Sequence, residues 1–141
     1  MKGAGQFDIK VRVPRWATGG FFVKINGQDR PLQAKPGTYV TLTRNWRAND
    51  TVDIRMPFGF SLEPVMDQPN VASIFYGPVL LAAEESGPRT DWRQVTLDAT
   101  DIGKSITGDP ATLRFKAGDA VLKPFYETYE RNSVYMNVAR K

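Results

Sequence analysis

The chain has 141 residues, of which 41% are hydrophobic, and a formal net charge of +4. A chain of this length suits one domain that buries about 68–70% of its unfolded surface. Cysteine and histidine are both absent, which excludes thiol and Ser–His nucleophiles and argues against a zinc, copper or iron–sulfur centre. We therefore expect neither a metal nor a cofactor.

Two segments bear on membranes and export. The longest apolar block, residues 78–83, is much shorter than the roughly 18 residues that a membrane-spanning helix needs. Met1 to Gly5 lead directly into a strand pattern and lack the features of a signal peptide. We expect no membrane partner. The compartment stays open, because the chain can be cytoplasmic or be exported as part of a larger protein.

The basic residues do not gather into one run. Lys10, Arg12 and Arg55 alternate with apolar residues, and Arg131 stands beside Glu130. This distribution is typical of the solvated face of a sheet, whereas a nucleic-acid site needs clustered positive charge. We expect no nucleic-acid partner.

The N-terminal part begins with a strand over residues 7–13, where apolar and charged residues alternate with the period of a half-buried antiparallel strand. Pro14 ends this strand because proline has no N–H to donate, and Trp16 follows as a large apolar anchor. A second strand over residues 23–25 leads into Asn26-Gly27, the strongest short hairpin signal.

Two more strands are predicted before residue 57. Lys35-Pro36-Gly37 is typical of a turn, and the β-branched and aromatic run Thr38–Thr43 predicts a strand. A loop over Arg44–Asp50 precedes a further alternating strand, Thr51–Met56. Spacings of about ten residues between strands are those of a sandwich or barrel.

The second half opens with a connection over residues 58–68 that has room for a short strand at 60–63. The next two runs, 71–76 and 79–83, are apolar at nearly every position and predict central strands covered on both faces. Gly77 between them predicts a bulge or kink. After a polar loop at 84–91, short strands are predicted at residues 94–98, 112–116, 121–126 and 133–138.

These elements predict an all-β fold, because no helical period appears along the chain. We expect a single antiparallel β-sandwich over residues 1–141, of the jelly-roll or immunoglobulin-like type.

The order of several short motifs resembles the C-terminal β-sandwich region of glycoside hydrolase family 127, the β-L-arabinofuranosidase-type proteins formerly filed as a domain of unknown function. The motifs are Val11-Arg12-Val13-Pro14-Arg15-Trp16, Val23-Lys24-Ile25-Asn26-Gly27, Gly37-Thr38-Tyr39-Val40, Arg44-Asn45-Trp46, Asp50-Thr51-Val52 and Tyr76-Gly77-Pro78-Val79. The resemblance covers about residues 7–85, the family-like core, and leaves residues 86–141 as a C-terminal extension. Within that extension, Pro124-Phe125-Tyr126 also resembles the segment that ends some members. In that segment a histidine is usual near the position of Tyr129.

The resemblance implies that catalysis belongs to another part of the parent enzyme. The resemblance implies that a helical toroid precedes this region in the parent enzyme and carries a cysteine nucleophile held on zinc. This chain has no cysteine that matches that nucleophile. We therefore expect a non-catalytic accessory domain of a glycoside hydrolase, whose partner is the α-helical catalytic domain of the parent chain. Two alternatives stay open: an independent carbohydrate-binding module, and an oligomerisation domain that forms a homo-oligomer.

Aromatic residues are the candidates for a carbohydrate contact. Trp92 lies in a polar loop outside any alternation and Tyr129 lies in a polar stretch, so both are predicted to be exposed, where a flat ring can stack on a sugar. Trp16 and Trp46, each at a strand end, are expected to close the ends of the sandwich.

No pair of carboxylates has a spacing that predicts a catalytic site. Glu84 and Glu85 are adjacent at a strand exit and are expected to point to opposite faces. Asp98 and Asp101 bracket a turn, where aspartate commonly accepts backbone N–H groups. No catalytic residue and no metal ligand is predicted.

Overall fold

The computed structural model describes residues 4–88 and 90–141. The chain divides into two compact units, Met1–Phe58 and Gly59–Lys141, where we expected one domain. Each unit has its own cluster of buried apolar side chains and its own sheets. The prediction about a signal peptide concerned residues 1–5, of which residues 1–3 lie outside the described part of the chain.

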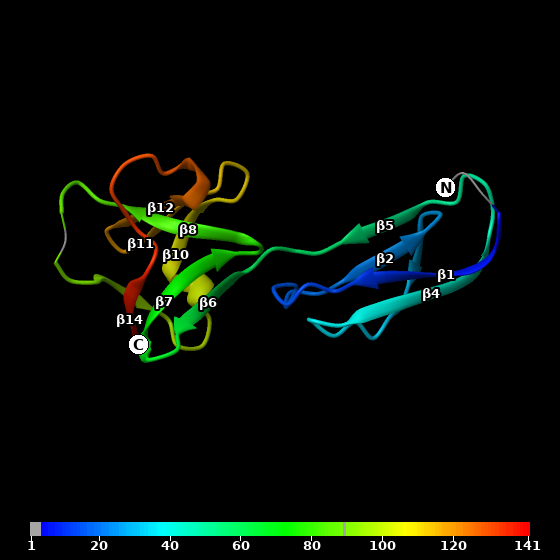
Figure 1. Cartoon of the computed structure of the whole chain (residues 1–141), viewed down its shortest axis with the longest axis horizontal. Helices are drawn as coiled ribbons and strands as arrows, with labels where there is room; N and C mark the ends of the chain where they lie inside the picture. The colour runs from blue at the N-terminus through cyan, green and yellow to red at the C-terminus, as the bar shows by residue number, and fades with distance from the viewer. Residues whose placement is uncertain (1–3, 89) are drawn as a thin grey trace. The chain divides into compact units, whose positions relative to one another are not determined.

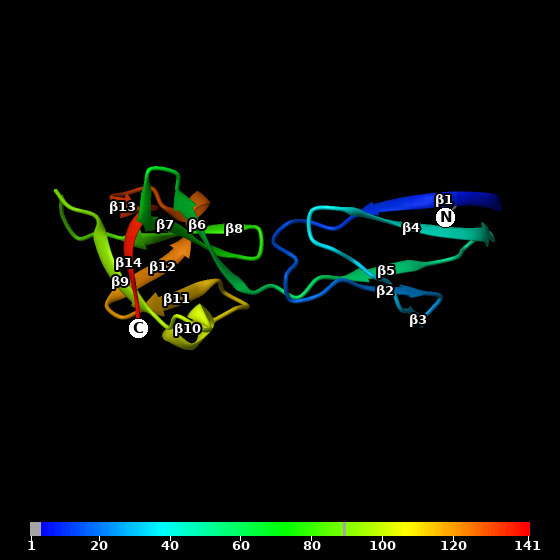
Figure 2. The same cartoon turned by 90° about the horizontal axis from the view of Figure 1, so that it is seen from below.

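The first unit consists of two small sheets, which Figure 2 shows as two layers. One sheet pairs β1 (Gly5–Arg12) with β4 (Tyr39–Trp46), and the other has the order β3-β2-β5. The second sheet is built from β2 (Phe22–Ile25), β3 (Gln28–Arg30) and β5 (Val52–Arg55). Apolar residues at alternate positions of both sheets, such as Val23, Val40 and Leu42, are buried in one shared cluster, as the period of two requires.

The predicted hairpin at Asn26-Gly27 is confirmed between β2 and β3. Asn26 and Gly27 have φ angles of +51° and +76°, the left-handed pair that a two-residue hairpin turn needs. The strand predicted at Thr38–Thr43 runs on to Trp46. Arg44, Asn45 and Trp46, expected in a loop, pair with the first residues of β1 because β1 begins at Gly5 and offers them partners.

The second unit contains one nine-stranded sheet that is nearly closed and barrel-like (Figure 1). Its main order is β10-β11-β12-β8-β7-β14-β9, with β6 beside β7 and β13 beside β8. The strands are β6 (Phe60–Val65), β7 (Gln68–Tyr76), β8 (Val79–Glu84), β9 (Arg93–Leu97), β10 (Ile106–Asp109), β11 (Arg114–Ala117), β12 (Ala120–Pro124), β13 (Asn132–Ser133) and β14 (Met136–Arg140).

The predicted central strands are confirmed, since β7 and β8 lie inside the order and contribute buried residues such as Ile74 and Leu81. Gly77 and Pro78 connect them as a two-residue hairpin turn, in which Tyr76 pairs with Val79. The expected bulge or kink is therefore a full reversal of the chain. Gly77 has a φ angle of +56°, which glycine adopts without steric cost.

The expectation of a wholly antiparallel sheet was wrong, because β14 pairs with β9 in parallel. The strand expected at residues 133–138 is split at Val134-Tyr135 into β13 and β14. This break lets the chain leave β8, the partner of β13, and continue beside β7 and β9. β10 lies where no strand was predicted.

The all-β class is confirmed. The described residues contain no α-helix, and two short 3₁₀ helices, η1 (Ile102–Ser105) and η2 (Phe125–Glu127), complete the second unit. No helix in this part of the chain has the length and apolar character to cross a membrane.

Candidate functional site

A groove of about 920 Å³ lies on the second unit. Its volume falls within the roughly 300–1,000 Å³ typical of ligand pockets. It is lined by residues that lie in β9, β13 and β14 or next to β8 and these strands, which are Glu85, Gly87, Pro88, Thr90, Asp91, Trp92, Gln94, Arg131, Asn132, Ser133, Val134, Tyr135 and Asn137.

The parallel pairing of β9 with β14, drawn side by side in Figure 2, aligns four of these side chains. Gln94 pairs with Asn137, and Trp92 and Tyr135 each stand two residues earlier in their segments. Because side chains alternate along a strand, this places an aromatic row and an amide row on one face. The rings of Trp92 and Tyr135 meet edge to face, with centroids 6.3 Å apart.

The two aromatic side chains are only half covered, since Trp92 is 46% and Tyr135 47% exposed. Within the described part of the chain, neither the Trp92 indole N–H, the Tyr135 hydroxyl nor the Asn137 amide makes a hydrogen bond. The Gln94 amide nitrogen donates to the Trp92 carbonyl at 3.2 Å. The groove therefore offers flat apolar surface together with unused donors and acceptors.

An ionic network centred on Arg93 connects Glu85 and Ser133, two residues of the groove lining. Arg93 points away from the exposed row and is buried, and it donates from Nη1 to Glu85 Oε2 at 3.0 Å and from Nη2 to Asp119 Oδ2 at 3.2 Å. The Ser133 hydroxyl donates to Glu85 Oε1 at 2.8 Å. These bonds join the start of β9 to the exit of β8 and to β13, and so fix the segments that carry Trp92 and Tyr135.

The two predicted contact residues have different positions. Trp92 lines the groove, whereas Tyr129 is 92% exposed and lies outside the lining. Tyr135, Gln94 and Asn137 were not predicted, because the long-range parallel pairing brings Tyr135 and Asn137 to the segment that carries Trp92 and Gln94.

The other tryptophans are structural, as expected. Trp46 is fully buried and its indole N–H donates to the Phe7 carbonyl at 2.9 Å. Trp16 packs against the same apolar cluster and meets Phe58 edge to face at 5.1 Å.

The carboxylates that we considered for catalysis do not share a site. Glu84 forms an ion pair with Lys123, while Glu85 pairs with Arg93. Asp98 accepts the backbone N–H groups of Thr100 and Asp101, which confirms its role in the turn. Among the described residues, no group of three or more acidic side chains is placed to hold a metal ion.

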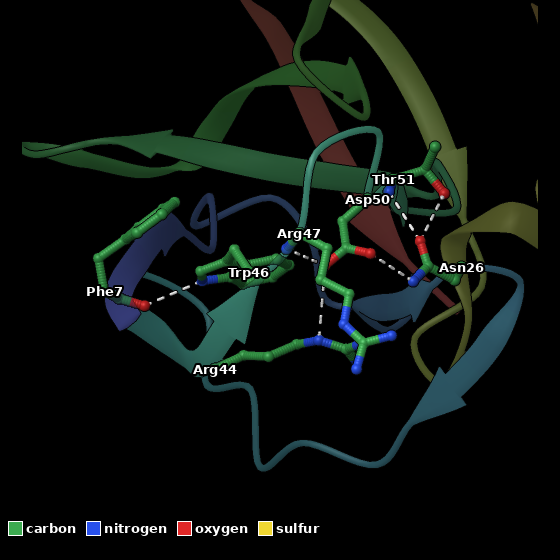
Figure 3. A network of polar contacts seen from close by, with 7 residues as sticks. All are labelled: Phe7, Asn26, Arg44, Trp46, Arg47, Asp50 and Thr51. Atoms are coloured by element: carbon green, nitrogen blue, oxygen red, sulfur yellow. Dashed lines mark hydrogen bonds and ion pairs between the residues drawn. The ribbon is translucent and has the colours of Figure 1, made fainter. Parts of the chain in front are cut away.

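A second polar network, in the first unit, surrounds Asp50 (Figure 3). Asp50 accepts the Arg47 backbone N–H at 2.9 Å and the Asn26 side-chain amide at 2.8 Å, and Arg44 Nε lies 3.6 Å away. The Asn26 carbonyl oxygen in turn accepts the Thr51 backbone N–H at 2.9 Å. The network ties the Asn26-Gly27 hairpin to the turn before β5, which is a structural role.

These hydrogen bonds make the first unit sensitive to acid. The Arg47 N–H, followed by the Asn26 amide, holds the pKa of Asp50 below the ordinary value of about 3.9. The stabilisation is complete above that ordinary value and is lost as pH falls through the lowered folded-state pKa. We expect a carboxyl ¹³C NMR titration to place the Asp50 midpoint below 3.9 and an Asn26→Ala variant to move it upward. An unchanged midpoint in the variant would contradict this account.

Residues 1–58 match the sequence profile of a family described as "Beta-L-arabinofuranosidase, GH127 middle domain". This span is the first unit, and it is shorter than the 7–85 over which the motifs showed the resemblance. The profile also describes a middle domain, where we expected a C-terminal region. A search of curated protein sequences gives no match.

Three solved structures are similar to nearly the whole chain. One is a GH127 β-L-arabinofuranosidase from Geobacillus stearothermophilus T6, with a TM-score of 0.68 and 19% identity over 99% of this chain and 27% of that chain. A GH127 β-arabinofuranosidase has a TM-score of 0.63 and 18% identity, covering 99% and 30%. A glycoside hydrolase has a TM-score of 0.66 and 21% identity, covering 97% and 28%. The chain thus spans less than a third of each of these proteins.

Proposed function

Since the first unit of this chain is a domain related to glycoside hydrolase family 127, we propose that the chain is a non-catalytic accessory region of a glycoside hydrolase. The family match over the first unit carries this proposal. We further interpret the two facing sheets of that unit as a small β-sandwich. The parent enzyme supplies the catalytic centre.

Two observations support the non-catalytic role. The chain contains no cysteine and no histidine, so nucleophilic and acid–base work falls to carboxylates, lysine or tyrosine. Glycoside hydrolysis by carboxylates needs two of them about 5–9.5 Å apart across one site. Glu84 and Glu85 have separate ionic partners, and Asp98 is engaged in a turn.

The partner that fits this role is the helical catalytic domain of the parent chain. The solved relatives are more than three times as long as the matched region, which leaves ample chain for such a domain. Phe125, Tyr126 and Tyr129 are large and exposed, and exposed apolar side chains that lie close together are typical of surfaces that another domain covers. The role is to support that domain and to shape the rim of its active site.

An activity assay tests the proposal directly. We expect purified chain 1–141 to release no aryl alcohol from aryl arabinofuranosides, while a full-length GH127 β-arabinofuranosidase does so under the same conditions. A circular dichroism spectrum typical of β-structure establishes that the assayed chain is folded. Turnover that increases in proportion to the concentration of the chain, and survives repeated purification, would overturn the non-catalytic assignment.

A further inference from the structure

We propose that the groove along Trp92, Tyr135, Gln94 and Asn137 is a binding site for a neutral oligosaccharide. The site lies on the second unit, outside the residues that match the family profile. The assignment to arabinofuranosyl-containing chains, in particular, rests on the proposed function. The assignment to a neutral saccharide rests on the groove itself.

The residues of the groove match the two kinds of surface that a sugar presents. A sugar ring has apolar C–H faces, which pack on flat aromatic rings, and Trp92 and Tyr135 present half-exposed rings that meet edge to face. It also has hydroxyl groups around its edge, which both donate and accept hydrogen bonds. The paired amides of Gln94 and Asn137, one row further along the strands, supply donors and acceptors in a plane.

The charges around the groove favour a neutral ligand. The four residues that define it are all uncharged. Among the other lining residues, Asp91 and Arg131 carry opposite charges, and the buried Glu85 is engaged with Arg93 and Ser133. An anionic ligand needs a surplus of arginine or lysine around it, and the lining residues that the structure describes, with Glu85 and Asp91 against Arg131, show no such surplus.

The groove has room for more than one sugar ring. Asn137 also lines a neighbouring hollow of about 520 Å³, together with Leu62, Asn70 and Arg140. Asn137 is therefore shared by two adjoining depressions. This arrangement fits a linear oligosaccharide that continues past Asn137 better than a single monosaccharide.

The backbone that carries the site is pre-organised. The Arg93 network fixes the segments before β9 and β14 on the buried side, so the aromatic pair needs little ordering when a ligand binds. Less ordering entropy is then lost on binding. An open groove of this kind binds a saccharide while leaving both ends of the ligand free to extend.

Titration of chain 1–141 with neutral arabinofuranosyl oligosaccharides tests the site, followed by calorimetry and by ¹H–¹⁵N spectra. We expect saturable binding, with shifts at Trp92, Tyr135 and Asn137. Trp92→Ala should weaken binding at least tenfold, about 1.4 kcal/mol, and Asn137→Ala should weaken it severalfold. Tyr129→Ala is the matched control, because it removes an exposed aromatic ring outside the groove and should leave the affinity unchanged.

The other possible results of these titrations test the location of the site, the class of ligand and the proposed function separately. Binding that survives Trp92→Ala, or that is lost in Tyr129→Ala, would overturn the location. If the folded chain binds none of the neutral arabinan, xylan and glucan oligosaccharides, the saccharide site is overturned. This result would favour a groove that a neighbouring domain covers. A preference for charged oligosaccharides would overturn the neutral assignment.

Binding of xylan or glucan chains without binding of arabinofuranosyl chains would support the groove as a saccharide site but contradict the arabinofuranosidase context. Hydrolysis by the chain would overturn only the proposed non-catalytic role.

Discussion

Replacing Glu85 by alanine is expected to lower the free energy of unfolding of the second unit by about 3–5 kcal/mol, the usual cost of breaking a buried ion pair by removing one partner. Only 7% of the Glu85 side chain is exposed, and Arg93 donates to it at 3.0 Å. Arg93 is itself buried, and its Nε has no hydrogen-bond partner among the described residues. After the substitution, its positive charge keeps Asp119 as an acidic partner.

Asp119 provides the matched control, because it binds the same guanidinium from an exposed position. Its side chain is 84% exposed, and exposed ion pairs contribute about 0–1 kcal/mol. Asp119→Ala should therefore change stability by less than about 1 kcal/mol. Urea denaturation measures both effects, and amide exchange in β8, β9 and β14 assigns them to the second unit.

A double substitution separates loss of the pair from loss of packing. Glu85→Leu combined with Arg93→Met removes both charges, and we expect it to recover most of the stability lost in Glu85→Ala. If the double variant is less stable than Glu85→Ala, the uncompensated charge is not the cause. Equal effects of Glu85→Ala and Asp119→Ala would also contradict the buried network as the source of stability.

The local parts of this fold were predictable because the signals are short-range. The alternation from Phe7 to Val13 depends on which face of a strand is buried, and Asn26-Gly27 depends on the left-handed φ angles of a two-residue turn. Both features depend only on residues that are close together in the sequence. The structure confirms them.

The pairing of β14 with β9 was not predictable in the same way. It joins segments that are about forty residues apart in the sequence, and no local pattern distinguishes a parallel from an antiparallel partner for a short apolar strand. The division into two units escaped prediction for a related reason, because alternation shows that a residue is buried but not in which core.

The short range of sequence signals also explains why Trp92 was predicted as a contact residue and Tyr135 was not. Trp92 was identified because a large aromatic residue interrupts a polar loop. Tyr135 was assigned to the interior of a continuous strand over residues 133–138, where alternation gives it no special meaning. The break between β13 and β14 and the parallel pairing of β14 with β9 together place Tyr135 beside Trp92.

Replacing Trp46 by alanine should destabilise the first unit by about 3–5 kcal/mol, the range for truncating a large buried aromatic side chain. Trp46 is fully buried at the end of β4, within the apolar cluster that both sheets share. Its indole N–H also donates to the Phe7 carbonyl across the β1–β4 pair at 2.9 Å, so the substitution removes both packing and a cross-strand bond.

A phenylalanine at the same position separates these contributions. Trp46→Phe keeps an aromatic ring but removes the indole N–H that donates to the Phe7 carbonyl, and the loss of one such hydrogen bond costs about 0.5–1.5 kcal/mol. Trp92→Ala removes the same type of side chain from a half-exposed position in the second unit and should leave amide exchange in β1 and β4 unchanged. If Trp46→Ala and Trp92→Ala reduce the protection of those amides equally, Trp46 does not anchor the core of the first unit.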